Sequence, residues 1–121
     1  MKIKSRKTHF KQVDPSSGIT STLSQTFGAA KSSEQRGVVN RHFAGAIACA
    51  KSNNSNAATV SLYHTIDSTS YLLDTVTLEP GESDIWNEDE YGIVLQKTHS
   101  ITMGIGGDVV NCWIKTYDTY L

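Results

Sequence analysis

Residues 58 to 66 read ATVSLYHTI, and apolar and polar side chains alternate along most of this stretch. Ala58, Val60, Leu62, His64 and Ile66 fall on one parity, whereas threonine, serine and tyrosine fill the other. Successive side chains of an extended strand point to opposite faces, so this period of two predicts a strand with one buried face. No recognisable catalytic motif follows it, and the stretch therefore indicates an architecture rather than a chemistry.

Segments of similar character lie on both sides of this stretch, separated by turn-forming residues such as Pro80-Gly81. We expect further strands at residues 19–27, 38–50, 71–78, 83–87, 92–95, 100–105 and 109–117. Residues 38–50 are rich in alanine, which also suits a helix, but their valines and the flanking strands favour a strand. In that segment Phe43, Ile47 and Cys49 share one parity and the alanines occupy the other. Seven to eight strands at this spacing predict an all-β fold, a single antiparallel β-sandwich of jelly-roll or immunoglobulin-like type.

The charges of this chain of 121 residues are distributed unevenly, although the net charge is only −1. Residues 1–41 carry eight Lys or Arg and two acidic residues, whereas residues 42–121 carry three Lys or Arg and ten acidic residues. Such a division predicts that the basic part meets an acidic surface, either nucleic acid or the acidic body of another subunit.

The basic residues concentrate before a Pro15-Ser16-Ser17-Gly18 break, so we expect two parts: a basic N-terminal arm at 1–18 and a β-sandwich domain at 19–121. Docking on a neighbouring subunit would order the arm, and a strand within the same domain would do so equally well. The candidate subunit contacts in the arm are Lys2, Lys4, Arg6, Lys7, Phe10 and Lys11. The candidate acidic docking residues are Asp84, Glu88, Asp89 and Glu90. Nucleic acid is the less favoured partner of the arm, because only Phe10 could stack on a base.

Residues that could carry chemistry are scattered. The four histidines lie in separate segments, and His64 is expected to be a hydrogen-bonded core or interface histidine. Cys49 and Cys112 are expected to be reduced thiols, although a sandwich could bring them together. The acidic run does not match a calcium loop, and the chain has no Walker or dinucleotide-binding motif. We therefore expect no enzyme activity, catalytic residue, metal or cofactor.

The longest apolar run is too short to cross a bilayer, and residues 1–17 lack the apolar centre of a signal peptide. The sequence therefore predicts a soluble product of the cytosol with no membrane partner.

The order of segments from Ala46 to Tyr117 resembles small β-sandwich structural proteins of tailed bacteriophage virions. The resemblance rests on GAIACAKSNNSNAA, TVSLYHTI, YLLDTVTLEPGES, GIVLQ, THSITM and a last strand after Gly106-Gly107-Asp108. It implies a non-enzymatic building block that assembles in many copies, with itself and with other virion proteins, as capsid decoration or at the neck or tail. Such a protein is made in the host cytoplasm and functions in the virion. The long basic N-terminal extension and Cys112-Trp113 depart from the pattern.

An alternative from another functional class is a carbohydrate-binding module or adhesin tip. Its sugar-binding platform would consist of Trp86, Tyr91 and Trp113, because flat aromatic rings stack on pyranose faces. Packing in a core or an interface is the commoner role of such rings.

Overall fold

The computed structural model describes residues 3–15, 22–26, 38–87, 92–96 and 98–120, with the backbone alone described at 3–5, 22–26, 38–40 and 120. Within these residues the chain forms only β-strands as extended regular structure, which confirms the predicted all-β class. The strands are β1 (Ile3–Val13), β2 (Thr22–Thr26), β3 (Val38–Ala50), β4 (Ala58–Ile66), β5 (Thr69–Leu78), β6 (Ser83–Asn87), β7 (Val94–Leu95), β8 (Ser100–Gly106) and β9 (Val110–Tyr120).

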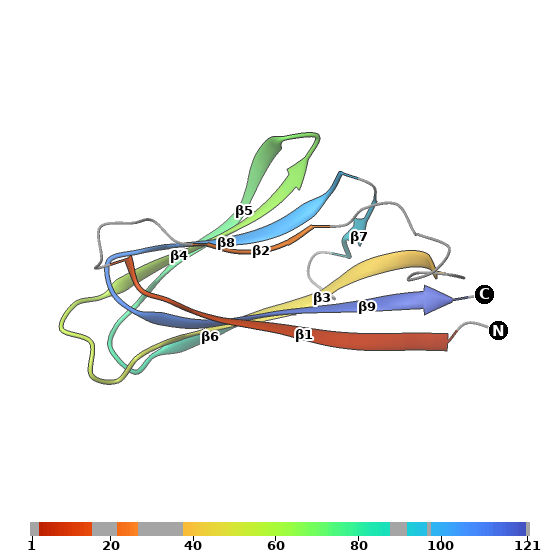
Figure 1. Ribbon diagram of the computed structural model, residues 1–121. Coiled ribbons are helices and arrows are strands. Elements are labelled where there is room, and N and C mark those ends of the chain that lie inside the picture. The colour runs from red at the N-terminus through yellow and green to blue at the C-terminus, as the bar shows by residue number, and fades with distance from the viewer. Residues whose placement is uncertain (1–2, 16–21, 27–37, 88–91, 97, 121) are drawn as a thin grey trace.

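The strands pair in a nested order, from the two ends of the chain inward. Strand β1 pairs with β9, β2 with β8, β3 with β6 and β7, and β4 with β5, always antiparallel. This arrangement is one long hairpin rolled up, which places its segments alternately in two sheets (Figure 1). The larger sheet has the order β1-β9-β3-β6, with β7 also on β3, and the smaller sheet has the order β2-β8-β4-β5. Of the two predicted types of sandwich, this nesting is that of the jelly roll.

The basic N-terminal segment is part of the sandwich, which corrects the boundary predicted at residue 18. Strand β1 pairs with β9 along its whole length, from Ile3 opposite Tyr120 to Val13 opposite Val110. Val13 is fully buried. The physical reason is that backbone pairing requires no apolar side chains, so a strand rich in lysine can form wherever a long partner strand offers an open edge. Of the two expectations for the arm, the strand within the same domain is the one observed.

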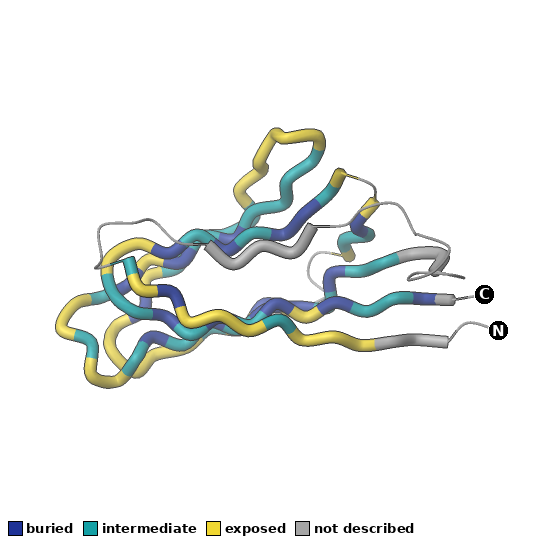
Figure 2. The backbone as a smooth tube through the Cα atoms, viewed as in Figure 1, coloured by how far each residue is buried: buried dark blue, intermediate teal, exposed yellow. Residues whose placement is uncertain are grey.

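The core fills the space between the two sheets, where buried segments of both layers face each other (Figure 2). Ala58, Val60 and Leu62 are buried with 0% exposure, as their parity predicts. The other buried apolar residues alternate along their strands in the same way, apart from the step of three between Phe43 and Ala46 on β3. They are Val13, Phe43, Ala46, Ala48, Ala50, Leu78, Trp86, Leu95, Ile101, Met103, Ile105, Val110, Cys112 and Ile114.

A β-bulge in β3 changes the alternation that the sequence predicts there. The register with β9 shifts between Phe43 and Gly45, and Gly45 has a φ of 119°. One extra residue reverses the parity, so Phe43 lies in the core with Ala46 and Ala48 rather than on the face of Ile47. A Cβ atom at Gly45 would lie 2.6 Å from the backbone oxygen of Trp86 on β6, which only glycine avoids.

Candidate functional site

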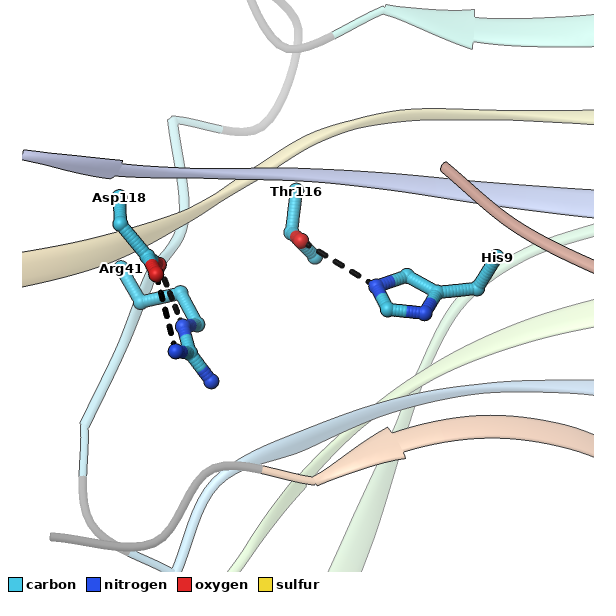
Figure 3. A network of polar contacts seen from close by, with 4 residues as sticks. All are labelled: His9, Arg41, Thr116 and Asp118. Carbon is cyan, nitrogen blue, oxygen red and sulfur yellow. Dashed lines mark hydrogen bonds and ion pairs between the residues drawn. The ribbon is translucent and has the colours of Figure 1, made fainter. Parts of the chain in front are cut away.

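A polar network lies on the inward side of the larger sheet (Figure 3). The guanidinium of Arg41 on β3 donates two hydrogen bonds to the carboxylate of Asp118 on β9, the one from Nη2 with a length of 2.9 Å. Their side chains are 16% and 14% exposed, so the two charges are largely withdrawn from water and compensate each other. Next to them, Nε2 of His9 lies 3.4 Å from Oγ1 of Thr116.

The protonation of His9 responds to this environment. Burial lowers the pKa of His9, and the positive charges of Lys7 and Arg41 lower it further. The network therefore favours a neutral imidazole, and it links β1 to β9 by side chains as well as by the backbone.

Two of the four histidines meet across the smaller sheet. Nε2 of His64 on β4 lies 3.2 Å from Nδ1 of His99, which precedes β8, and the rings are edge to face. Burial lowers the pKa of His64, and the charge of His99 lowers it further. The prediction of a hydrogen-bonded histidine at 64 is confirmed, whereas its partner carried no signal in the sequence because residues 64 and 99 meet only through strand pairing.

The aromatic residues considered for sugar binding do not form one platform. Trp86 is 2% exposed and points into the core, where its indole nitrogen donates a hydrogen bond of 2.8 Å to Asp74. Trp113 lies on β9 between the core residues Cys112 and Ile114, so its side chain points to the opposite face of the same sheet. Tyr91 lies outside the described residues. Strand parity thus separates the two tryptophans, and the predicted platform is wrong for this pair.

The outward face of the larger sheet carries apolar and aromatic side chains in one row. Phe10, Trp113, Ile47 and Ile85 are directly opposite one another on β1, β9, β3 and β6. The rings of Phe10 and Trp113 are tilted by 46° with centroids 5.0 Å apart. Phe10 is 56% and Ile85 57% exposed, so the two ends of the row are open to water.

A second row on the same face combines a cation with two rings. Arg6, Tyr117 and His42 are opposite one another on β1, β9 and β3. The Tyr117 and His42 rings stack at 4.5 Å with an interplanar angle of 11°. The guanidinium carbon of Arg6 lies 5.5 Å from the centre of the Tyr117 ring, in the range of a cation–π contact. We call these two rows the outer-face rows.

The charged candidates from the sequence have different positions. Arg6 and Lys7 are exposed neighbours on β1 and point to opposite faces of the strand, and Lys11 is also exposed. Asp84 is half-buried on β6, opposite Ala48, and its Oδ1 accepts a hydrogen bond from its own strand at Ile85. The remaining candidates, Lys2, the side chain of Lys4, Glu88, Asp89 and Glu90, lie outside the described residues. The structure thus shows no contact between the basic and the acidic candidates that it describes.

The end of the β4–β5 hairpin exposes two large apolar side chains that were not singled out from the sequence. Tyr71 is 54% and Leu72 58% exposed. They are consecutive residues of β5 and point to opposite faces, so both faces of the hairpin meet water here. Figure 1 shows this end of the hairpin standing away from the rest of the sandwich. The signal in the sequence is the run Tyr71-Leu72-Leu73, which interrupts the alternation of apolar and polar residues.

Both cysteines are free thiols on adjacent strands. Cys112 is buried and lies opposite Ala48, whereas the half-buried Cys49 points to the outward face. Burial, and secondarily Cys49, raises the pKa of Cys112 to about 12. Within the described parts of the chain, no three His, Cys, Asp or Glu side chains come together as a metal site would require. The described residues also form no apolar helix long enough to span a membrane.

Comparison of this chain with models of known protein families and with curated protein sequences found no match.

Proposed function

We propose that this chain is a non-enzymatic structural protein of a tailed bacteriophage virion, which assembles in many copies as capsid decoration or at the neck or tail. The resemblance of its strand pattern to small virion sandwiches supports the proposal. The jelly roll is an architecture of viral capsid domains, but lectin domains share it, so the fold alone does not choose a function. The choice rests on the surface of the molecule.

The observation that carries the proposal is the projecting hairpin with Tyr71 and Leu72. Both side chains are more than half exposed, on an edge strand of the smaller sheet. Fully burying a side chain of this size contributes roughly 1.5–3 kcal/mol, so a surface that covers both would be stabilised substantially. A neighbouring virion subunit is the partner that we assign to this hairpin tip.

Strand β1 provides a second contact in this proposal, which replaces the arm expected from the sequence. Among the described strands it pairs on one side only, with β9. An open edge accepts a strand from a neighbour through backbone hydrogen bonds. The exposed cations Arg6 and Lys7 on this edge suit an acidic neighbouring surface, including the acidic part of another copy.

The proposal is tested by following the chain into particles. Leu72→Ser is introduced into a tagged copy of the chain that is expressed during infection. The number of tagged chains per purified virion is then measured by quantitative mass spectrometry. We expect many copies of the unmodified chain per particle, and a reduction of roughly tenfold or more for Leu72→Ser, because a loss of about 1.4 kcal/mol per contact is a factor of ten in affinity.

Thr77→Ser is the matched control, because Thr77 is an exposed residue of the same strand. It should leave the copy number unchanged. If purified virions contain none of the unmodified chain, the proposed function is wrong. If Leu72→Ser enters particles as well as the control, the hairpin tip is not the contact.

A further inference from the structure

The side chains of the outer-face rows have no part in the proposed contact at the hairpin tip. Phe10 and Trp113 form one ring pair, and His42 and Tyr117 form another. Both pairs lie on the outward side of the larger sheet. Trp113 and Tyr117 are four residues apart on β9, which separates the two pairs by about 13 Å.

Positive charge lies between and beside these rings. Lys115 is exposed on β9 midway between Trp113 and Tyr117, and Arg6 covers the Tyr117 ring. A hollow of about 300 Å³ lies at this place and is lined by Arg6, Lys7, Thr8, Ala44, Lys115 and Thr116. Arg6 and Lys115 are the lining cations with the outward parity of these rows, whereas Lys7 and Thr116 have the inward parity.

Among the described residues of the larger sheet, no acidic side chain has the outward parity of these cations. Among the described residues of β1, β3, β6 and β9, the acidic ones on the larger sheet are Asp84 and Asp118. Both have the inward parity, opposite Ala48 and Arg41. A partner of this face must therefore bring anionic groups to the hollow and flat apolar groups to the rings.

We propose that the outward face of the larger sheet binds single-stranded nucleic acid. A base stacks on the exposed ring of Phe10, which Trp113 supports from β9, and a backbone phosphate occupies the hollow between Arg6 and Lys115. Stacking on aromatic rings along a cationic surface is how single strands are bound without sequence preference. This role does not depend on the hairpin-tip contact, which lies on the smaller sheet, although it shares Arg6 with the contact proposed for strand β1.

Charge distinguishes this ligand from two others. Two copies meeting face to face would place Arg6 and Lys115 of one copy against those of the other, which like charges oppose. A neutral sugar would stack on Phe10 but would leave the cations without a counter-charge. A duplex would not use the aromatic rings of this face, because its bases are already stacked on one another.

The experiment measures the fluorescence anisotropy of labelled oligothymidylate and oligouridylate of about 15 nucleotides, a length within the range of known single-strand sites. The full chain is titrated at several salt concentrations, with a duplex of equal length for comparison. We expect both single strands to bind more tightly than the duplex. We also expect Phe10→Ala to weaken binding roughly tenfold, and Phe10→Trp to retain it. The tryptophan variant keeps the test valid if alanine lowers the stability of the fold.

Tyr71→Ala removes an equally exposed ring from the smaller sheet and should leave binding unchanged. Arg6→Gln should reduce the slope of log affinity against log salt by about 0.7, the value for one phosphate contact of a single strand. Lys11→Gln, on the other face of the same strand, should change the slope less. The proposal is overturned if single strands do not bind at low salt, if the duplex binds equally well, or if Phe10→Ala and Tyr71→Ala have equal effects. If the free protein forms a dimer and Phe10→Ala dissociates it, this face is a contact between two copies of the chain, and the proposal is likewise overturned.

Discussion

The indole nitrogen of Trp86 donates a hydrogen bond of 2.8 Å to a carboxylate oxygen of Asp74, which joins an edge strand of each sheet. Strand β6 ends the larger sheet and β5 ends the smaller sheet, so this bond links the two layers at their shared edge. The buried indole also fills part of the core, and the bulge at Gly45 passes close to the Trp86 backbone.

Loss of this link is expected to lower the free energy of unfolding. Trp86→Phe keeps an aromatic ring but removes the donor, and it leaves the half-buried Asp74 without the indole partner. Because hydrogen bonds to charged groups contribute about 1.5–3 kcal/mol, we expect a loss of roughly 2 kcal/mol or more in urea unfolding. Asp74→Asn retains an acceptor and should cost less. An unfolding midpoint for Trp86→Phe equal to that of the unmodified chain would contradict this role.

The bulge at Gly45 is expected to tolerate no side chain. Gly45→Ala places a methyl group 2.6 Å from a backbone oxygen at a φ of 119°, so either β3 or β6 must shift. We expect a destabilisation of about 3 kcal/mol, measured by thermal or urea unfolding. Gly106→Ala is the control, because a Cβ atom there meets nothing within 4 Å. Equal stability of the two variants would show that the bulge is not constrained by close approach.

The two cysteines are expected to differ in reactivity. The thiolate is the reactive form, and the raised pKa of Cys112, about 12, keeps this buried group protonated at neutral pH. A chromogenic disulfide reagent should therefore modify one thiol quickly and the second only after unfolding. Cys49→Ser should remove the fast phase, and Cys112→Ala should leave it. Two fast phases in the native protein would contradict the burial of Cys112.

Acid is expected to destabilise the fold through its histidines. The pKa values of His9 and His64 are lowered from 6.5 by burial and by neighbouring positive charge, so the unfolded chain binds these protons more readily. Their contribution is complete above about pH 6.5 and is lost as the pH falls from there through the lowered values. Thermal unfolding between about pH 7.5 and 5.5 should show this decrease. His64→Gln should reduce the slope of the unfolding temperature against pH. If a double variant with His9→Gln and His64→Gln has an unchanged slope, other groups cause the loss of stability in acid.

The strands and their buried faces were accessible from the sequence, because alternation is a local property. Strands β3, β4 and β6 have the predicted limits, and Ala58, Val60 and Leu62 are buried as their parity requires. The prediction failed where the signal was not local. Gly45 reverses the parity within β3, and the lysine-rich residues 3–13 lack the apolar face that normally marks a strand.

The sequence by itself determined that this chain forms a β-sandwich, since a period of two decides which side chains share a face. Only the tertiary structure decided which strands are neighbours. His9 and Thr116 are 107 positions apart and yet adjacent, because β1 and β9 close the roll from the two ends of the chain. The same pairing brings Phe10 to Trp113 and Arg6 to Tyr117. Lateral neighbours in a sheet come from long-range backbone hydrogen bonding, which leaves little trace in the side chains of either strand.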